Sequence, residues 1–361
     1  MIKETEYRLI TFYKFVDIAN PIDVVKDHKQ FCSDIGMKGR IYIGEEGINA
    51  QISCNTGQEK AYRLFLDASE HFKNIQDIDT KATPIECHKF PKMIVKYRNE
   101  IVAMGEIYKS SEIAKSTFKM SIDEFKEVMD SNPDDYVILD MRNDYEYELG
   151  HFKTAIPAAT DTFKEVMDKL KDYKAEFAEK EVIMYCTGGI RCEKLGALLE
   201  NSGLKGVRQL DGGVIKYVNT FDDGNWLGNL YTFDDRISTY VGSENTHTVI
   251  SKSYYSDLPA EDYFNCRYAD CQSHFTAKPD EYKKHYGFCS EQCRDKAIED
   301  LLIRNADFDK NNYKLLRGSI KQNPALEEMI KEKIRKEILA ATKNIEFKFK
   351  VPVKRRFKKG D

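Results

Sequence analysis

The sequence predicts an α+β domain, then an α/β domain with a parallel sheet, then a cysteine-rich region. Three observations support this. Strand and helix signals in residues 6–98 follow the order β-α-β-β-α-β, and short apolar strands alternate with helices from 136 onward. Four cysteines then gather between residues 266 and 293. The first order is typical of a split βαβ domain, and the alternation indicates a sheet with helices on both faces.

The first domain is expected to have the ferredoxin-like, or acylphosphatase-like, arrangement. Pro21 suits the first turn of a helix, and the turn Glu45–Gly47 separates two strands. A later helix carries apolar residues at helical spacing, namely Leu64, Phe65, Ala68 and Phe72. The predicted elements are a strand at 6–14, a helix from 21 to about 35, two strands within 39–53, a helix at 57–72 and a strand at 91–98.

The second domain is predicted from its alternating elements. Ser121 and Glu124 form a capping box ahead of its first helix. The elements are a helix at 122–130, a strand at 136–140, a helix at 162–178, a strand at 182–185, a helix at 192–202, a strand at 207–210 and a helix from 213. Functional groups in such a sheet lie where the carboxyl ends of strands meet helix N-termini, and Cys186 occupies such a point.

The chain of 361 residues is long enough for two or three domains. A charged helical stretch is expected at 324–342 and a basic end at 343–361. The boundaries that we predict are 1–100 for an RNA-binding first domain, 101–132 for a connector, 133–227 for the α/β domain, 228–300 for the cysteine-rich region and 301–361 for a charged tail.

Composition favours a cytoplasmic protein. No run approaches 18 apolar residues and the N-terminus has no secretory pattern, so we expect no membrane span and no export. The odd count of nine cysteines favours reduced thiols over disulfides. A net charge of only −4 argues against extensive coating of nucleic acid, although the last twelve residues are strongly basic.

The loop 186-CTGGIR-191 predicts a reactive cysteine. Its glycines let successive backbone amides converge on one point, so the amides of Thr187, Gly188, Gly189 and Ile190 are candidate donors to the sulfur. The positive end of the next helix and the charge of Arg191 also favour a thiolate, which predicts a low pKa for Cys186. The alternative is a buried structural cysteine before a glycine-rich turn.

The length of this loop disfavours a phosphatase. Four residues separate Cys186 from Arg191, which makes a cradle for one bound sulfur atom or a similar small anion, whereas a five-residue spacing fits phosphate. Cys192 follows at the first turn of the helix. It is either a resolving thiol that forms a transient disulfide with Cys186 or a residue that packs the helix start.

The loop resembles that of rhodanese domains, which carry sulfur as a cysteine persulfide. Two further rhodanese-like signatures are 140-DMRNDYEYELGHF-152 and 154-TAIPAA-159. The residues that match the first signature are expected to brace the active-site loop rather than to perform chemistry. They are Asp140, Arg142, Glu146 and His151.

A closer resemblance covers roughly residues 5–295. The nonapeptide 186-CTGGIRCEK-194, with 38-KGRIYIGEEGIN-49, 90-FPKMIVKYRNEIV-102 and 210-LDGG-213, is similar to the oxygen-dependent tRNA uridine hydroxylases. That family makes 5-hydroxyuridine at wobble position 34 and often has Gly where this chain has Ala50. The resemblance implies O2 as co-substrate and a tRNA anticodon loop as partner, and the sequence shows no flavin or nicotinamide fingerprint. Protein partners are not indicated.

The expected chemistry centres on Cys186 as an essential thiolate or persulfide. Addition of a nucleophile to C6 of uracil makes C5 enolate-like, and Arg191 with the loop amides would stabilise the developing negative charge. Two alternatives stay open. One is a rhodanese-type sulfurtransferase that donates sulfur for tRNA thiolation, and the other is a non-catalytic RNA-binding or scaffold protein.

Aromatic and basic residues of the first domain are candidates for RNA binding. A wobble nucleotide lies in a single-stranded loop, which proteins bind by stacking and by contacts to base edges. The alternative is core aromatics with solvated lysines. The candidates are Lys38, Arg40, Tyr42, Lys92, Lys96 and Arg98, with Phe90 and Tyr97 beside them.

The late cysteines predict a structural zinc site. Cys266 and Cys271 form one close pair, Cys289 and Cys293 form another, and 17 residues separate the pairs. His274 or His285 could replace one ligand, and the alternative is four reduced thiols in a small core. The other cysteines, Cys32, Cys54 and Cys87, are expected to pack in the core.

Overall fold

The N-terminal sheet has the strand order of a ferredoxin-like fold with one strand added. In this computed structural model the elements are β1 (Tyr7–Phe15), α1 (Pro21–Asp34), β2 (Lys38–Gly44), β3 (Gly47–Asn55), α2 (Thr56–Ala68), β4 (Thr83–Ile85) and β5 (Met93–Tyr97). The order across the sheet is β4-β1-β3-β2-β5. The first four strands pair antiparallel, and β5 joins the edge parallel to β2. The predicted fold is therefore confirmed.

The structure describes residues 7–297 apart from 74, 76–81, 106, 116–117, 132–134, 159–168, 170–175, 178–179, 202–206, 223, 243–246 and 272, and also Glu328 and Glu332. The helices predicted at 162–178 and 324–342 and the basic end at 343–361 therefore lie largely or wholly outside the described residues. Within these residues, no helix has the length and apolar content needed to cross a membrane.

Two details of the first domain differ from the prediction. The fourth strand of the pattern is β4, whereas the segment predicted as the last strand forms the additional β5. A three-residue strand with proline in it gives almost no sequence signal, and proline is tolerated there because β4 is an edge strand. Leu64 is 71% exposed, so its place in the predicted apolar stripe is wrong. Tyr62 and Leu66 take the buried side of α2, and Phe72 is buried beyond the helix end.

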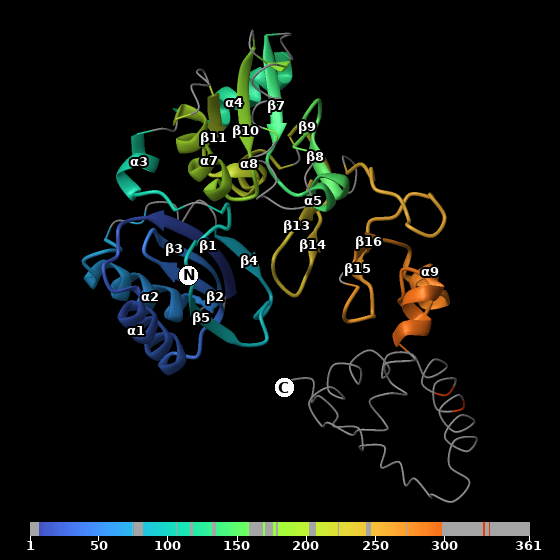
Figure 1. Ribbon diagram of the computed structural model, residues 1–361, viewed down its shortest axis with the longest axis horizontal. Coiled ribbons are helices and arrows are strands. Elements are labelled where there is room, and N and C mark those ends of the chain that lie inside the picture. Colours follow the sequence, from blue (N-terminus) through green and yellow to red (C-terminus); the bar gives the residue numbers. More distant parts are fainter. Residues whose placement is uncertain are drawn as a thin grey trace, which may run out of the picture. The chain divides into compact units, whose positions relative to one another are not determined.

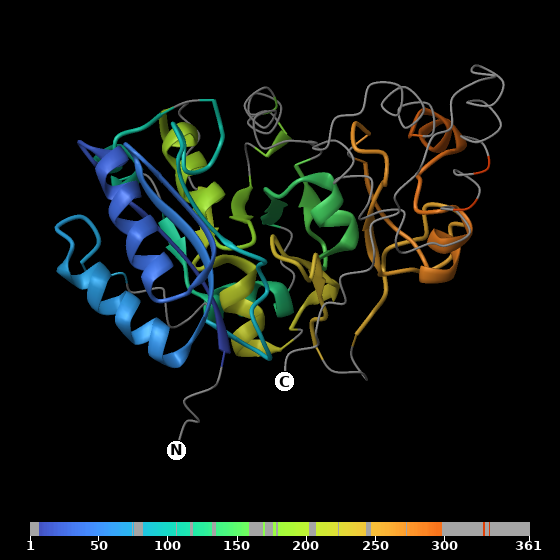
Figure 2. The same ribbon diagram turned by 90° about the horizontal axis from the view of Figure 1, so that it is seen from below.

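The two faces of the N-terminal sheet have different roles. Helices α1 and α2 lie together on one face, in blue in Figures 1 and 2. Because side chains alternate along a strand, Ile10 and Phe12 of β1 join the core with these helices. Their neighbours Thr11 and Tyr13 therefore lie on the opposite face of the sheet. That face contributes to the candidate site described below.

The second domain is a parallel α/β sheet, as predicted. Its elements are α3 (Ser110–Lys115), β6 (Phe118–Met120), α4 (Ile122–Ser131), β7 (Tyr136–Asp140), α5 (Asp144–Leu149), β8 (Gly150–Phe152), β9 (Ile156–Pro157), β10 (Glu181–Tyr185), α7 (Ile190–Asn201), β11 (Val207–Leu210) and α8 (Gly213–Phe221). The strand order is β6-β11-β10-β7-β9, with every pair parallel. Strand β6 lies in the segment that we expected to be a connector.

Both faces of this sheet are buried under helices. Met184 of β10 packs in one core with Leu195 of α7, and Ile183 packs in a second core with Phe125 of α4 and Tyr217 of α8. Figure 1 shows α7, α4 and α8 around β10 and β11. This double coverage explains the continuous apolar run of β10, and it leaves the carboxyl end of that strand as the place where polar groups emerge.

Shorter elements complete the chain. Strand β12 (Trp226–Gly228) pairs with β8, and β13 (Leu230–Tyr231) pairs with β14 (Ser238–Thr239). Strands β15 (Tyr263–Asn265) and β16 (His274–Thr276) form a two-stranded sheet, followed by α9 (Pro279–Lys284) and helical residues 291–297. The chain divides into one unit of Met1–Tyr263 with Phe275–Lys278, and a second of Phe264–His274 with Pro279–Asp361.

Candidate active site

Cys186 lies directly after β10, in a loop that curls around its sulfur. Helix α7 begins at Ile190, so Arg191 and Cys192 both belong to its first turn. Gly189 has a φ of +95°, a conformation that favours glycine, and its amide donates a hydrogen bond of 3.1 Å to the Cys186 sulfur. Cys186 itself is only 1% exposed. The loop thus encloses the sulfur among backbone donors.

The environment of Cys186 stabilises its thiolate. Burial alone would raise the pKa, but a hydrogen bond from the Cys192 thiol, the charge of Arg191 and the amides of Cys192 and Arg191 lower it to about 6. Sequence reasoning proposed amides from 187–190. The amides of Arg191 and Cys192 were missed because the helix begins two residues earlier than predicted.

Cys192 is the thiol partner of this thiolate. It is fully buried in the same core as Cys186. Burial, followed by its hydrogen bond to Cys186, raises the pKa of Cys192 well above the usual range. The two cysteines therefore form a thiol–thiolate pair in which Cys192 keeps the proton. Cys192 thus packs in the core at the helix start and also donates a hydrogen bond to Cys186.

Glu146 holds Arg191 in place beside the sulfur. The guanidinium of Arg191 donates to both carboxylate oxygens of Glu146, at 2.7 and 2.9 Å, and the Thr187 hydroxyl donates to the same carboxylate at 3.1 Å. Burial would raise the pKa of Glu146, but Arg191 keeps it below its usual value. Glu146 thus contacts two loop residues directly, which is the arrangement expected of a residue that braces the loop.

The remaining residues of the 140–152 signature act one step further from the sulfur. Arg142 donates to Asp140 and to the Gly150 carbonyl, both at 2.6 Å, and Tyr185 of β10 also donates to Asp140 at 2.6 Å. This network ties the segment that carries Glu146 to the strand that carries Cys186. His151 instead stacks on the Tyr147 ring at 3.9 Å and contacts the Tyr147 carbonyl.

The N-terminal domain packs against the cysteine loop, which sequence reasoning missed. Lys194 is completely buried, and its ammonium lies 3.0 Å from Glu46 and 2.9 Å from Glu100. The Tyr13 hydroxyl of β1 donates to Glu193 at 2.7 Å. Glu46, Glu193 and Lys194 all stand inside the quoted family motifs, which was the available signal, but no local pattern shows that the motifs meet.

A cavity of about 200 Å³ lies beside the loop, between the two domains of the first unit. It has room for several water molecules. Thr187 of the cysteine loop lines this cavity. Residues of the N-terminal sheet, among them Thr11 on the face opposite α1 and α2, line part of the other side. Lining residues include Leu9, Thr11, Gln51, Thr83, Thr187, Asn219, Tyr231, Phe233, Arg236 and Tyr240.

The residues predicted to bind RNA differ in their exposure and in their contacts within the protein. Arg40 donates to the carbonyl of the cavity residue Phe233 at 3.1 Å, and Arg98 lies over the Tyr42 ring at 5.2 Å. Lys92 and Lys96 are exposed, Lys38 is half-buried and Tyr97 is at the limit of exposure. Phe90 is buried beneath Arg40 and cannot stack on a base without a rearrangement.

The cysteines outside the loop have three kinds of environment. Cys32 and Cys54 are buried in the first core, and burial raises the pKa of each to about 12. Cys87 is exposed, so its prediction as a core residue is wrong. The sulfurs of Cys266, Cys271, Cys289 and Cys293 all lie within 4.8 Å of one another.

Family models cover most of the chain. Residues 7–101 match the UPF0176 acylphosphatase like domain, residues 121–220 the rhodanese-like domain and residues 227–294 the rhodanase C-terminal model. These assignments agree with the two folds described above.

Curated relatives match 80–86% of this chain. A protein of Staphylococcus carnosus is 34% identical over 86% of this chain and 97% of its own length. One of Bacillus licheniformis is 35% identical, over 81% of this chain and 89% of its own length, and one of Staphylococcus aureus strain Newman is 37% identical over 80% and 89%. Each is named tRNA uridine(34) hydroxylase. With its rhodanese-type cysteine loop and this similarity along most of its length, the chain belongs to the tRNA uridine(34) hydroxylase family.

Proposed function

We propose that this protein hydroxylates C5 of uridine 34 in tRNA, with O2 as co-substrate. The observation that carries the proposal is a buried Cys186 with a pKa of about 6 in a cradle of amides, one residue from a cavity that the N-terminal domain helps to enclose. Family membership supports the substrate and the reaction. Because tRNA is the proposed substrate, we also propose a cytoplasmic location.

Cys186 would activate the base by adding to it. Attack of its thiolate on C6 of uracil places negative charge on the C5–C4–O4 system, so that C5 becomes able to react with oxygen. Arg191 and the loop amides are positioned to stabilise negative charge close to the sulfur. Hydroxylation by O2 also consumes two electrons and two protons, and releases the second oxygen atom as water. The reactive anion is Cys186 itself or a persulfide sulfur that it carries.

The cavity would receive the base, and the N-terminal domain would hold the RNA. Tyr231, Phe233 and Tyr240 line the cavity and offer ring faces for stacking. Arg40 reaches the same wall through Phe233, and Lys96 is exposed on the neighbouring strand, in register with Tyr42. Phosphate contacts from these cations would orient a single-stranded anticodon loop toward Cys186. We therefore propose RNA binding for the first domain, residues 1–100, and catalysis for the α/β domain, whose sheet begins at β6 rather than at the predicted residue 133.

Nucleoside mass spectrometry of tRNA from a deletion strain tests the reaction. We expect 5-hydroxyuridine to be absent from the deletion strain and from one complemented with Cys186→Ser, and present with the wild-type gene. Cys87→Ser is the matched control, because Cys87 is exposed and distant in the sequence from the loop, and it should restore the product fully. Loss of thiouridine with retention of hydroxyuridine would favour the sulfurtransferase alternative and contradict the proposal.

Measurements of tRNA affinity and product formation with purified protein test the RNA-binding part of the proposal. The double variant Arg40→Ala/Lys96→Ala should bind tRNA more weakly and should lower the slope of log affinity against log salt by about 0.7 per lost phosphate contact. Product formation should recover at high tRNA concentration, since Cys186 is intact. An unchanged salt slope would show that these cations do not contact the RNA backbone.

A further inference from the structure

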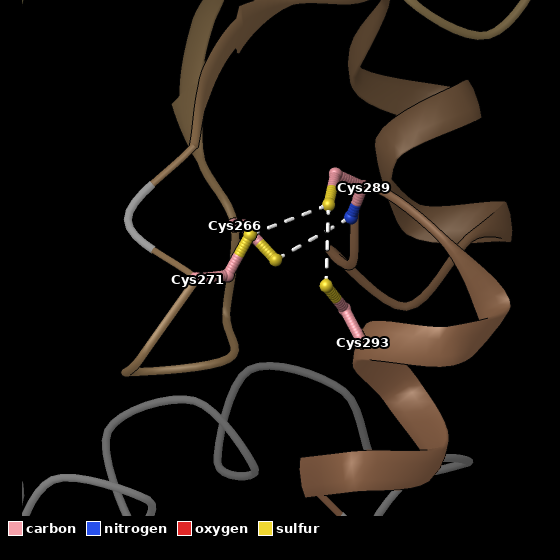
Figure 3. Close-up of side chains that lie close together, drawn as sticks. All are labelled: Cys266, Cys271, Cys289 and Cys293. Atoms are coloured by element: carbon pink, nitrogen blue, oxygen red, sulfur yellow. Dashed lines mark hydrogen bonds between the residues drawn. The ribbon is translucent and has the colours of Figure 1, made fainter.

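The second unit gathers four cysteine sulfurs at one point, as Figure 3 shows. The Cys289 sulfur lies 3.6 Å from Cys271 and 3.4 Å from Cys293, and all four sulfurs lie within 4.8 Å of one another. All four thiols are free. The cluster belongs to the second unit, whereas the Cys186 loop belongs to the first, and the proposed reaction does not use the cluster.

The spacing of these sulfurs matches a tetrahedral metal centre. A zinc–sulfur bond of about 2.3 Å places two thiolates of a tetrahedron about 3.8 Å apart, close to the separations in the cluster. The sulfurs also have donors around them: the Cys289 amide points to Cys266 at 3.5 Å, and the Ser273 hydroxyl contacts Cys271 at 3.0 Å. Such donors stabilise thiolates that bind a metal.

The backbone brings the four ligands from two separate elements. Cys266 and Cys271 lie in the turn between β15 and β16, whereas Cys289 and Cys293 lie at the start of the helical residues 291–297 (Figure 3). The amide of Cys293 donates to the Ser290 hydroxyl at 3.1 Å, which caps that helix start. A centre bound by all four would therefore join the turn to the helix.

Among the described residues 264–297, the module around the cluster has little apolar core of its own. Phe264 stacks on Tyr282 with ring centroids 4.0 Å apart, and Phe288 and Ala297 are buried. Segments of this size rarely hold a fixed fold by apolar burial alone and usually need a disulfide or a metal. Because the four thiols are free rather than joined in disulfides, we expect a metal to supply this support.

We propose that Cys266, Cys271, Cys289 and Cys293 bind one zinc ion that fixes the fold of this module. Four protein ligands fill every position of a tetrahedral zinc, so the site is structural and has no open position for a substrate. His274 stays outside the ligand set, because its ring contacts Asn265 at 2.7 Å. This proposal stands whether or not the hydroxylase proposal is correct.

Metal analysis of the untagged full-length protein, purified under reducing conditions, tests the proposal. We expect one zinc per chain in the wild type and in Cys87→Ser, and almost none in Cys271→Ser or Cys293→Ser. Cys293→His should retain zinc, because imidazole nitrogen is also a zinc ligand. Equal zinc in the wild type and the serine variants would overturn the assignment, and so would iron in place of zinc.

A second measurement uses wild-type protein, so that it tests the proposal even if the serine variants fail to fold. Wild-type protein stripped by a chelator should take up one Co²⁺ per chain, with the strong visible absorption of tetrahedral cobalt thiolates. Stripping should also abolish amide exchange protection across 264–297 and leave that of β7 and β10 unchanged. Disulfides among the four cysteines, or protection that does not respond to the chelator, would show that no metal supports the module.

Discussion

Among the favourable contacts of Cys186, the one with the Cys192 side chain lowers its pKa most. After the unfavourable effect of burial, the largest influence on its pKa is the hydrogen bond from the Cys192 thiol, ahead of the charge of Arg191. The Cys186 thiolate is thus stabilised by a second thiol, which donates a hydrogen bond to it and keeps its own proton.

Replacing Cys192 should raise the pKa of Cys186. We expect Cys192→Ala to move the midpoint clearly above 6, and Cys192→Ser to move it less, since the hydroxyl restores a donor. The measurement is the ultraviolet absorbance of the thiolate against pH, taken as a difference from Cys186→Ser. A midpoint that stays at about 6 in Cys192→Ala would assign the acidity to Arg191 and the amides instead.

The same pKa fixes the direction of the pH dependence. The folded pKa of Cys186 lies below that of a free thiol, so its contribution to stability is complete above the free-thiol pKa and is lost as the pH falls toward 6. Product formation that needs the thiolate should likewise decline as the pH falls below about 6. In Cys192→Ala this decline should begin at a higher pH.

At the scale of elements, the cysteine loop depends on where its glycines lie. Gly189 adopts a positive φ, and a Cβ there would meet the Tyr13 hydroxyl at 2.9 Å. Gly188 has no such conformation, and its nearest neighbour is the Thr11 methyl at 4.0 Å. A side chain should therefore be tolerated at Gly188 but not at Gly189, a difference that the sequence alone does not show.

Gly188→Ala and Gly189→Ala form a matched pair. We expect Gly188→Ala to keep the pKa of Cys186 and most of the activity. Gly189→Ala should shift the amide away from the sulfur, raise the pKa and reduce turnover at least tenfold, which corresponds to about 1.4 kcal/mol. Thiolate absorbance and single-turnover hydroxylation measure both effects. Similar behaviour of the two variants would mean that the loop does not depend on this conformation.

The sequence predicted the long elements and missed the short ones. Strands β7 and β10 have continuous apolar runs, and α1 begins at a proline, so each was recognisable. Strands β4 and β6 contain three residues each and are held by their neighbours in the sheet rather than by a local pattern. The loop chemistry was likewise predictable from spacing, while its amide donors depended on the residue at which α7 starts.

At the scale of the whole molecule, a buried ion cluster joins the two domains of the first unit. Lys194 follows the cysteine loop, and its partners Glu46 and Glu100 come from positions 148 and 94 residues earlier. Glu46 also accepts the Ile101 amide at 2.7 Å. Such contacts cannot be read from one sequence, because each residue alone is typical of an exposed surface.

Removing Lys194 should destabilise the protein strongly. Lys194→Met leaves Glu46 buried without its cation, which costs about 3–5 kcal/mol. Adding Glu46→Gln should recover part of this loss, since the uncompensated charge is then absent. Urea unfolding measures both values, with the exposed Lys92→Met as control. Additive effects of the two substitutions would mean that the pair is not coupled.

The enclosure of Cys186 has a consequence for the lifetime of the enzyme. A sulfur anion that works with oxygen risks irreversible conversion to sulfinic or sulfonic acid, and this damage is fastest for charged and accessible sulfurs. Cys186 is charged but almost completely covered. By burying this sulfur, the fold restricts the access of oxidants to it and so slows its irreversible oxidation.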